Sequence, residues 1–256
     1  MRYMKKEINR ILGFTISCLV FVAWITTGYS QQTATQGESS LWPSDESMFP
    51  GKGPIQKADW FKKLWNERRG RWKAEAEKDK GAVVFVGDSI TQGWRTLDKD
   101  FPYLKVANRG ISGDTTRQVL YRIKEDVISL KPTAIVLLIG TNDLGLGGNP
   151  DDAAENIKAI LTQIRKELPE TPVIVCKVMP RHPQFAEKIK RLNSLVDDFI
   201  KNDKHIIPCD TWSIFADENG GAKKEEFPDL LHPNAAGYKK WKMALDPIFE
   251  KLNLKK

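Results

Sequence analysis

The sequence predicts a three-layer α/β/α sandwich around a five-stranded parallel β-sheet. Five short apolar runs recur along the chain, at residues 82–86, 104–107, 134–139, 173–178 and 206–209. Amphipathic helical patterns follow the runs, at residues 115–130, 151–168, 184–201 and 235–254. Strands that are apolar along their whole length are typical of parallel sheets covered by helices on both faces.

The first thirty residues have the layout of a secretory signal peptide. Four basic side chains between Arg2 and Arg10 precede an apolar run over residues 11–25, and small and polar residues continue to Ser30. We expect cleavage after Ser30 and a secreted or periplasmic protein without a stable membrane anchor. The run is short for a membrane-spanning helix. An uncleaved anchor is the alternative.

Composition sets limits on the partners of the chain. Its 256 residues are 41% hydrophobic, enough for a substantial core. Loss of residues 1–30 removes four basic and one acidic side chain, which lowers the formal net charge from +7 to +4. This mild charge, without a basic stripe, predicts no nucleic-acid partner.

Cysteine and histidine usage argues against a metal site. The chain has no Cys-x-x-Cys pair and only three histidines, so we expect no metal and no organic cofactor. Outside the signal sequence, Cys176 and Cys209 both lie in strand-like runs. They are either a disulfide or two buried thiols.

Two segments precede the first predicted strand. Residues 31–57 are rich in Gln, Ser, Thr, Gly and Pro and are interpreted as a linker or N-terminal arm. Residues 59–80 are predicted helical, with Trp60, Leu64, Trp65 and Trp72 among charged residues. Such a helix binds glycans or anionic surfaces, or packs its tryptophans on the domain; we favour packing. The main domain is predicted over residues 58–256.

Polar and glycine-rich segments follow the first three predicted strands. Ser89 comes after the first strand, residues 110–114 after the second, and residues 140–143 after the third. Because the carboxyl ends of parallel strands meet at one edge of a sheet, we expect these segments to form one site.

Ser89 needs a base to become a nucleophile. His205 stands at the head of the last strand, which is the wrong end, and His182 has no carboxylate close in sequence. His232 has Asp229 three residues before it, a spacing that allows the carboxylate to orient the imidazole. The same turn could also serve simply to begin the last helix.

A tetrahedral oxyanion needs preorganised hydrogen-bond donors. The candidates are the backbone N–H groups of Ser89 and Gly113 and the side-chain amide of Asn142. Taken alone, Gly113 and Asn142 would each be a turn residue.

Four segments of the chain resemble the sequence blocks of the SGNH (GDSL) hydrolases, in the same order. They are Gly87-Asp88-Ser89, the run from Asn108 to Thr115, Gly140-Thr141-Asn142-Asp143, and Asp229-Leu230-Leu231-His232. The likeness spans roughly residues 80–250. The second block, continued to Thr116, is similar to the platelet-activating-factor acetylhydrolase-like branch. The Gly-x-Ser-x-Gly elbow of α/β-hydrolases is absent from the sequence around Ser89.

The resemblance implies a flavodoxin-like SGNH hydrolase fold and assigns roles. Ser89 would be the nucleophile, His232 the base and Asp229 its orienting partner, while Gly113 and Asn142 complete the oxyanion hole beside the Ser89 amide. It implies a cofactor-free serine ester hydrolase that works through an acyl-enzyme.

The substrate is less defined. We expect short acyl groups, such as acetyl, on a carbohydrate or a similar small ester. A lipid or lysophospholipid acylhydrolase is the alternative, and a non-catalytic glycan-binding module on this fold is a different class. Trp94 could stack on a sugar or fill the core, and we favour the core; the loop 144–148 could shape the acyl pocket.

Overall fold

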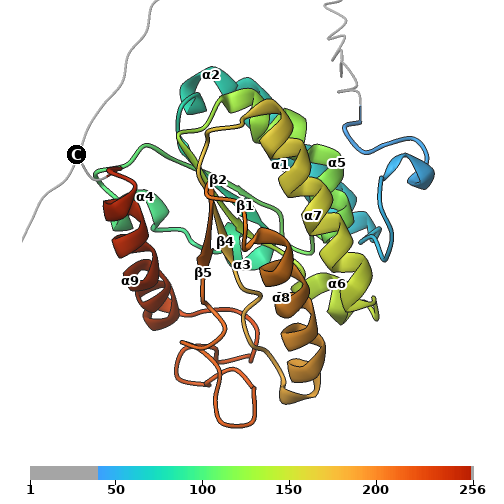
Figure 1. Cartoon of the computed structure of the whole chain (residues 1–256). Coiled ribbons are helices and arrows are strands. Elements are labelled where there is room, and N and C mark those ends of the chain that lie inside the picture. Colours follow the sequence, from blue (N-terminus) through green and yellow to red (C-terminus); the bar gives the residue numbers. More distant parts are fainter. Residues whose placement is uncertain (1–39, 255–256) are drawn as a thin grey trace, which may run out of the picture. The chain divides into compact units, whose positions relative to one another are not determined.

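Five parallel strands form the predicted sheet. In this computed structural model, which describes residues 40–254, the strand order is β2-β1-β3-β4-β5 (Figure 1). The strands are β1 (Val83–Gly87), β2 (Val106–Gly110), β3 (Ala134–Leu138), β4 (Val173–Cys176) and β5 (Ile206–Cys209). All four neighbouring pairs are parallel. The fold class is confirmed. The predicted signal sequence lies outside the described residues.

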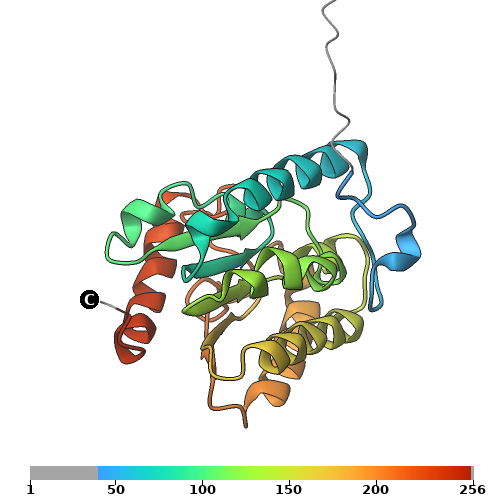
Figure 2. The ribbon, with the colours of Figure 1, turned by 90° about the horizontal axis from the view of Figure 1, so that it is seen from above.

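Helices cover both faces of the sheet (Figures 1 and 2). One face carries α5 (Thr116–Asp126), α7 (Pro150–Glu167) and α8 (Ala186–Ile200). The other carries α3 (Ser89–Gln92), α4 (Leu97–Asp100) and α9 (Ala235–Lys251). The remaining elements are η1 (Glu46–Met48), α1 (Asp59–Ala74), α2 (Ala76–Asp79), η2 (Ile128–Leu130), α6 (Thr141–Gly145) and η3 (Pro183–Phe185).

Alternate residues of the central strands enter two separate cores. Val84 and Val86 of β1 pack towards α5, α7 and α8. Val83 and Phe85 pack on the opposite side, among the aromatic residues of α9 and the segment after α3. Trp94 belongs to this second core, with 2% of its surface exposed, so the core interpretation of Trp94 is confirmed.

The described part of the arm, residues 40–57, packs against α1 and α5 (Figure 2). Phe49 of the arm lies in a third apolar cluster with Phe61, Trp65 and Trp72 of α1. The packing interpretation of the tryptophan-rich helix is therefore confirmed for Trp65 and Trp72. It is wrong for Trp60, whose side chain is 54% exposed.

Side chains from two distant helices hold the backbone of the arm. Arg117 donates to three carbonyl groups between residues 49 and 53. Gln118 bonds both the N–H and the carbonyl of Gln56. Asn156 of α7 does the same for Lys52. The irregular segment thus has the hydrogen-bond partners that a buried backbone requires.

The second strand lies later than its apolar run predicts. β2 covers Val106–Gly110 instead of residues 104–107. Asn108 and Arg109 extend it because polar side chains find partners at this edge of the sheet. Asn108 bonds the carbonyl of Thr91, and buried Arg109 pairs with Asp79 at 2.7 Å.

Cys176 and Cys209 are register partners on β4 and β5. Both thiols are buried and free. Within residues 40–254, no helix is long and apolar enough to cross a membrane.

Candidate active site

A tight strand-to-helix turn presents Ser89. Asp88 caps α3 by accepting a hydrogen bond from the Ile90 N–H at 2.9 Å, and Ser89 is the first residue of the helix. Glycine at position 87 allows the end of β1 to pack closely on β3, because a β-carbon there would lie 2.2 Å from the Leu138 carbonyl oxygen. The hydroxyl group therefore stands at the carboxyl edge of the sheet.

The structure brings Ser89, His232 and Asp229 into one hydrogen-bonded row. The Nε2 atom of His232 lies 2.9 Å from the Ser89 Oγ. Its Nδ1 atom lies 2.7 Å from Oδ2 of Asp229. Ser89 and His232 are 143 positions apart in sequence. The loop between β5 and α9 carries His232 and Asp229 to the start of α3, where Ser89 lies. This arrangement can transfer a proton from a serine to an imidazole whose other nitrogen is fixed.

The turn between Asp229 and His232 is built around the carboxylate. Its Oδ1 atom accepts from the backbone N–H groups of Leu231 and His232, at 3.0 and 2.7 Å. Leu230 adopts a φ of 58°, a strained value that this turn enforces. Partial burial acts to raise the pKa of Asp229, but the hydrogen bonds from His232 and Leu231 outweigh it and hold the pKa below its usual value. Asp229 is thus a carboxylate beside the imidazole.

The two other candidate oxyanion residues lie in touching loops. Gly113 has a φ of 91°, which a glycine adopts freely. The side-chain amide of Asn142 donates a hydrogen bond to the backbone carbonyl of Asp114, the residue after Gly113, at 2.9 Å. The loop also touches α3, because Gln92 accepts from the Ser112 N–H at 2.7 Å. The segments after β1, β2 and β3 therefore meet, as the sequence predicts.

Three carboxyl groups lie buried beneath these loops. Burial raises the pKa of Asp88 to about 7 and that of Asp114 to about 7. Burial also raises the pKa of Asp143, to about 6, although hydrogen bonds from Thr116 oppose the shift. Asp143 accepts from the N–H and the hydroxyl of Thr116, so it fixes the start of α5 to α6.

Two arginines that sequence reasoning missed hold the framework. Arg122 is fully buried; it pairs with Asp114 at 2.8 Å and donates to the carbonyls of Gly87 and Arg109. It therefore connects β1, β2 and the Gly113 loop. Arg181 donates to the Thr141 carbonyl, at the start of the helix that carries Asn142. Helical spacing places Arg122 on α5, but only the tertiary structure supplies its partners.

Among the described residues, neither of the other two histidines hydrogen-bonds the Ser89 hydroxyl group. His205 is at the start of β5, 3.5 Å from Glu170, at the opposite edge of the sheet, as predicted. His182 is exposed before η3, and it is His232 that contacts Ser89. Within the described part of the chain, no group of three or more His, Cys, Asp or Glu residues is placed to hold a metal ion.

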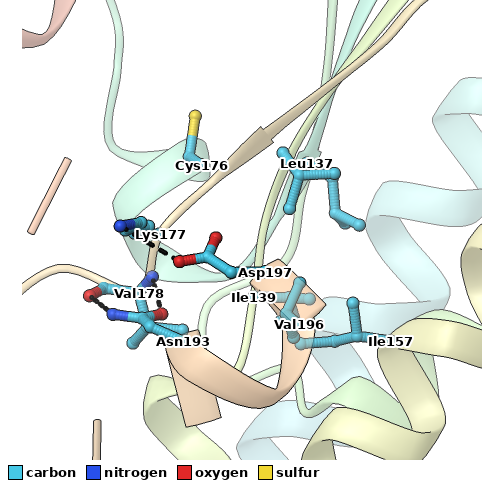
Figure 3. Close-up of a pocket in the computed structure, with 10 residues that line it drawn as sticks. Leu137, Ile139, Ile157, Cys176, Lys177, Val178, Asn193, Val196 and Asp197 are labelled. Atoms are coloured by element: carbon cyan, nitrogen blue, oxygen red, sulfur yellow. Dashed lines mark hydrogen bonds and ion pairs between the residues drawn. The ribbon is translucent and has the colours of Figure 1, made fainter. Parts of the chain in front are cut away.

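The cavity drawn in Figure 3 is separate from this site. It lies between β4 and α8, where Asn193 bonds Val178 and Lys177 pairs with Asp197. Its volume of about 10 Å³ admits about one water molecule and no substrate.

Comparison with known proteins agrees with this geometry. Residues 85–240 match the model of the GDSL-like Lipase/Acylhydrolase family. A human relative, platelet-activating factor acetylhydrolase IB subunit alpha2, is 30% identical over 186 residues, which are 69% of this chain and 79% of the relative.

Solved structures share the fold. A GDSL-like lipase from Bacteroides thetaiotaomicron superposes with a TM-score of 0.63 at 29% identity, covering 72% of this chain and 97% of that one. An acetyl-xylooligosaccharide esterase from a Geobacillus species has a TM-score of 0.53 at 19% identity, over 68% of this chain and 94% of its own. At this identity the second likeness concerns the fold alone.

Proposed function

The chain belongs to the GDSL-like lipase/acylhydrolase family and is an ester hydrolase, and we propose that it works through an acyl-enzyme on Ser89. The observation that carries this proposal is the row Ser89–His232–Asp229, with contacts of 2.9 and 2.7 Å. No observation favours a non-catalytic glycan-binding module, the other class that the sequence left open.

In the proposed mechanism His232 Nε2 takes the Ser89 proton while the Oγ atom forms a bond to the ester carbonyl carbon. The N–H groups of Ser89 and Gly113 and the amide of Asn142 stabilise the oxyanion. The carbon–oxygen bond to the alcohol breaks, and the alcohol leaves with the proton held by His232. Water then attacks the acyl-enzyme by the same route and restores Ser89.

We propose an acetyl or similarly short acyl group on a carbohydrate as the substrate. The human relative is named as an acetylhydrolase, and this supports a short acyl group. The same name, which gives platelet-activating factor as what the relative acts on, also supports the alternative of a lipid or lysophospholipid acylhydrolase. The acyl length is tested by chain-length preference, and we expect kcat/KM to fall from p-nitrophenyl acetate to octanoate to palmitate. The alcohol part is tested by comparing acetylated xylan with a phospholipid that carries an acetyl ester, and we expect only the xylan to be hydrolysed efficiently. A preference for palmitate would contradict the short-acyl proposal.

The nucleophile is tested by Ser89→Ala, for which we expect kcat for p-nitrophenyl acetate to fall at least about 10³-fold with an unchanged circular dichroism spectrum. An active-site phosphonate should label the wild type at Ser89 and leave the variant unlabelled, as read by peptide mass. Ser129→Ala is the matched control, because η2 precedes β3 and so lies at the other edge of the sheet. Wild-type activity in Ser89→Ala would refute the assignment.

We also propose that the protein is exported. Support comes from the basic and apolar layout of residues 1–30, which lie outside the described part of the chain. Expression in a secreting host should give a mature protein that begins at residue 31, measured by intact mass.

A further inference from the structure

Trp60 is an exposed aromatic residue that the packing of α1 does not explain. Five large hydrophobic side chains are exposed among residues 40–254, and two of these are aromatic: Trp60 at 54% and Phe199 at 41%. Its neighbours on α1, Phe61 and Trp65, are fully buried. An exposed indole is a common feature of a binding surface, because it offers a large rigid apolar face with one polar group.

The exposed ring of Trp60 lies against the loop that carries Gly113. A β-carbon built on Gly113 would be 2.8 Å from Cη2 of Trp60 and 3.1 Å from the ring of Phe61. The outer edge of the indole therefore covers the backbone of a residue proposed to bind the oxyanion. Phe61 supports the indole edge-to-face, with the ring centroids 5.8 Å apart.

Hydrogen bonds connect the segment before Trp60 to the same loop. Gln118 is buried and holds the Gln56 backbone through both its amide atoms. Its carbonyl oxygen also accepts from the hydroxyl of Thr115, two residues after Gly113. The side chain of Gln56 in turn accepts from the Ala58 N–H, directly before α1. Hydrogen bonds therefore fix the segment that carries the indole to the site. The family match begins at residue 85 and does not include Trp60.

We propose that Trp60 is a specificity-determining residue that stacks on the sugar ring carrying the ester. This inference rests on the proposed function. The ester carbonyl must reach Ser89, so the larger part of the substrate extends outward past the rim of the site. A flat exposed aromatic face at that rim matches the flat apolar face of a pyranose ring.

A lipid tail would need a continuous apolar groove instead. Two of the five exposed hydrophobic side chains lie near the segments of the candidate oxyanion hole. Trp60 of α1 packs against the Gly113 loop, and Leu146 follows the helix that carries Asn142. Gly113 and the half-buried Asn142 lie in these two segments, and both offer polar groups. One flat aromatic face beside polar groups suits a sugar, which has a flat apolar ring face and several hydroxyl groups.

The test compares Trp60→Ala, Trp60→Phe and wild type on acetylated xylo-oligosaccharides, p-nitrophenyl acetate and a phospholipid with a short acetyl chain. We expect Trp60→Ala to lower kcat/KM for the oligosaccharide about tenfold relative to that for p-nitrophenyl acetate, mainly through KM. Trp60→Phe should restore most of this ratio because it keeps a flat ring. Phe199→Ala is the matched control, since the end of α8 leads into the start of β5, away from the site.

Equal losses on all three substrates would overturn the proposal, because they would mean that Trp60 only supports the Gly113 loop. An unchanged ratio, or a loss specific to the phospholipid, would overturn it as well. Calorimetric binding of acetylated xylo-oligosaccharides to Ser89→Ala, with and without Trp60→Ala, tests the contact without turnover. It separates failure of this inference from failure of the proposed nucleophile, which would appear as persistent activity in Ser89→Ala.

Discussion

Single residues of the candidate site were predictable where their chemistry is local in sequence. Asp229 and His232 lie within one turn, and their spacing already indicates that a carboxylate can hold an imidazole. Ser89 was predictable from its place directly after an apolar strand. The buried partners were not: nothing near Asp114 in the sequence indicates that Arg122 will bond it, because the contact forms only when α5 packs against the strand ends.

Asn142 gives a prediction about the oxyanion. Asn142→Ala removes a neutral donor beside the Gly113 loop, and we expect kcat for p-nitrophenyl acetate to fall about 10²- to 10³-fold with little change in KM. Steady-state kinetics measure this. Asn202→Ala, an exposed residue after α8, is the control. A loss of less than about threefold would remove Asn142 from the proposed mechanism.

Asp88 gives a prediction about pH and stability. Burial raises the pKa of Asp88 to about 7, and the charges of Asp114 and Asp143 add to the effect. Between pH 4 and 7 the folded protein therefore holds a proton that the unfolded chain has released near pH 4. The free energy of unfolding should fall as the pH rises through this interval.

Asp88→Asn tests the origin of this pH dependence, because asparagine keeps the cap on Ile90 and cannot ionise. Urea unfolding at pH 5, 6, 7 and 8 should show a smaller decline in the variant than in wild type. The exposed Asp98→Asn is the control and should leave the decline unchanged. Parallel curves for wild type and Asp88→Asn would show that Asp88 does not titrate in this interval.

At the scale of elements, the long amphipathic helices were all predicted, but their ends were not: the helix predicted over residues 115–130 stops at Asp126, and the one over residues 59–80 is divided into α1 and α2. The pattern over residues 151–168 is α7 (Pro150–Glu167), which Asn149 caps with its side chain. The short helices α4 and α6 were missed, and α3 was expected only as a turn entering a helix, because four or five residues cannot show a helical period. They exist through caps and tertiary contacts, such as the hydrogen bond that the Asp88 carboxylate accepts from the Ile90 N–H at the start of α3.

Gln118 gives a prediction about the docking of the arm on α5. Gln118→Ala leaves the N–H and the carbonyl of Gln56 without partners, which should cost about 1–3 kcal/mol in the free energy of unfolding. We also expect faster proteolysis within residues 50–57, which mass spectrometry of the cleavage products measures. Gln163→Ala on α7 is the control. Unchanged stability and cleavage would mean that the arm is held without Gln118, by the packing of Phe49 and the hydrogen bonds of Arg117 and Asn156.

For the molecule as a whole, the parallel sheet followed from the alternation of strands and helices, but the docking of the arm did not. The arm is rich in residues that are typical of linkers, and its own sequence does not indicate which residues of the domain it will contact. These are Arg117, Gln118 and Asn156, each of which lies more than sixty positions after the arm residue that it bonds. The exposed face of Trp60 was missed for the same reason, since helical spacing gave it the same expectation as Trp65.

Truncation tests whether the arm is part of the folded unit. A chain that begins at residue 58 loses Phe49, which is 1% exposed, and Trp42, whose ring lies 5.5 Å from Trp65. Burial of such a side chain contributes about 1.5–3 kcal/mol, so we expect a loss of about 3 kcal/mol or more. In a protein of this size that lowers Tm by about 6–12 °C. A chain that begins at residue 40 keeps the described arm and should match the longer protein in calorimetry. Equal Tm values for the chains that begin at residues 40 and 58 would show instead that residues 40–57 are a tether that contributes nothing to the fold.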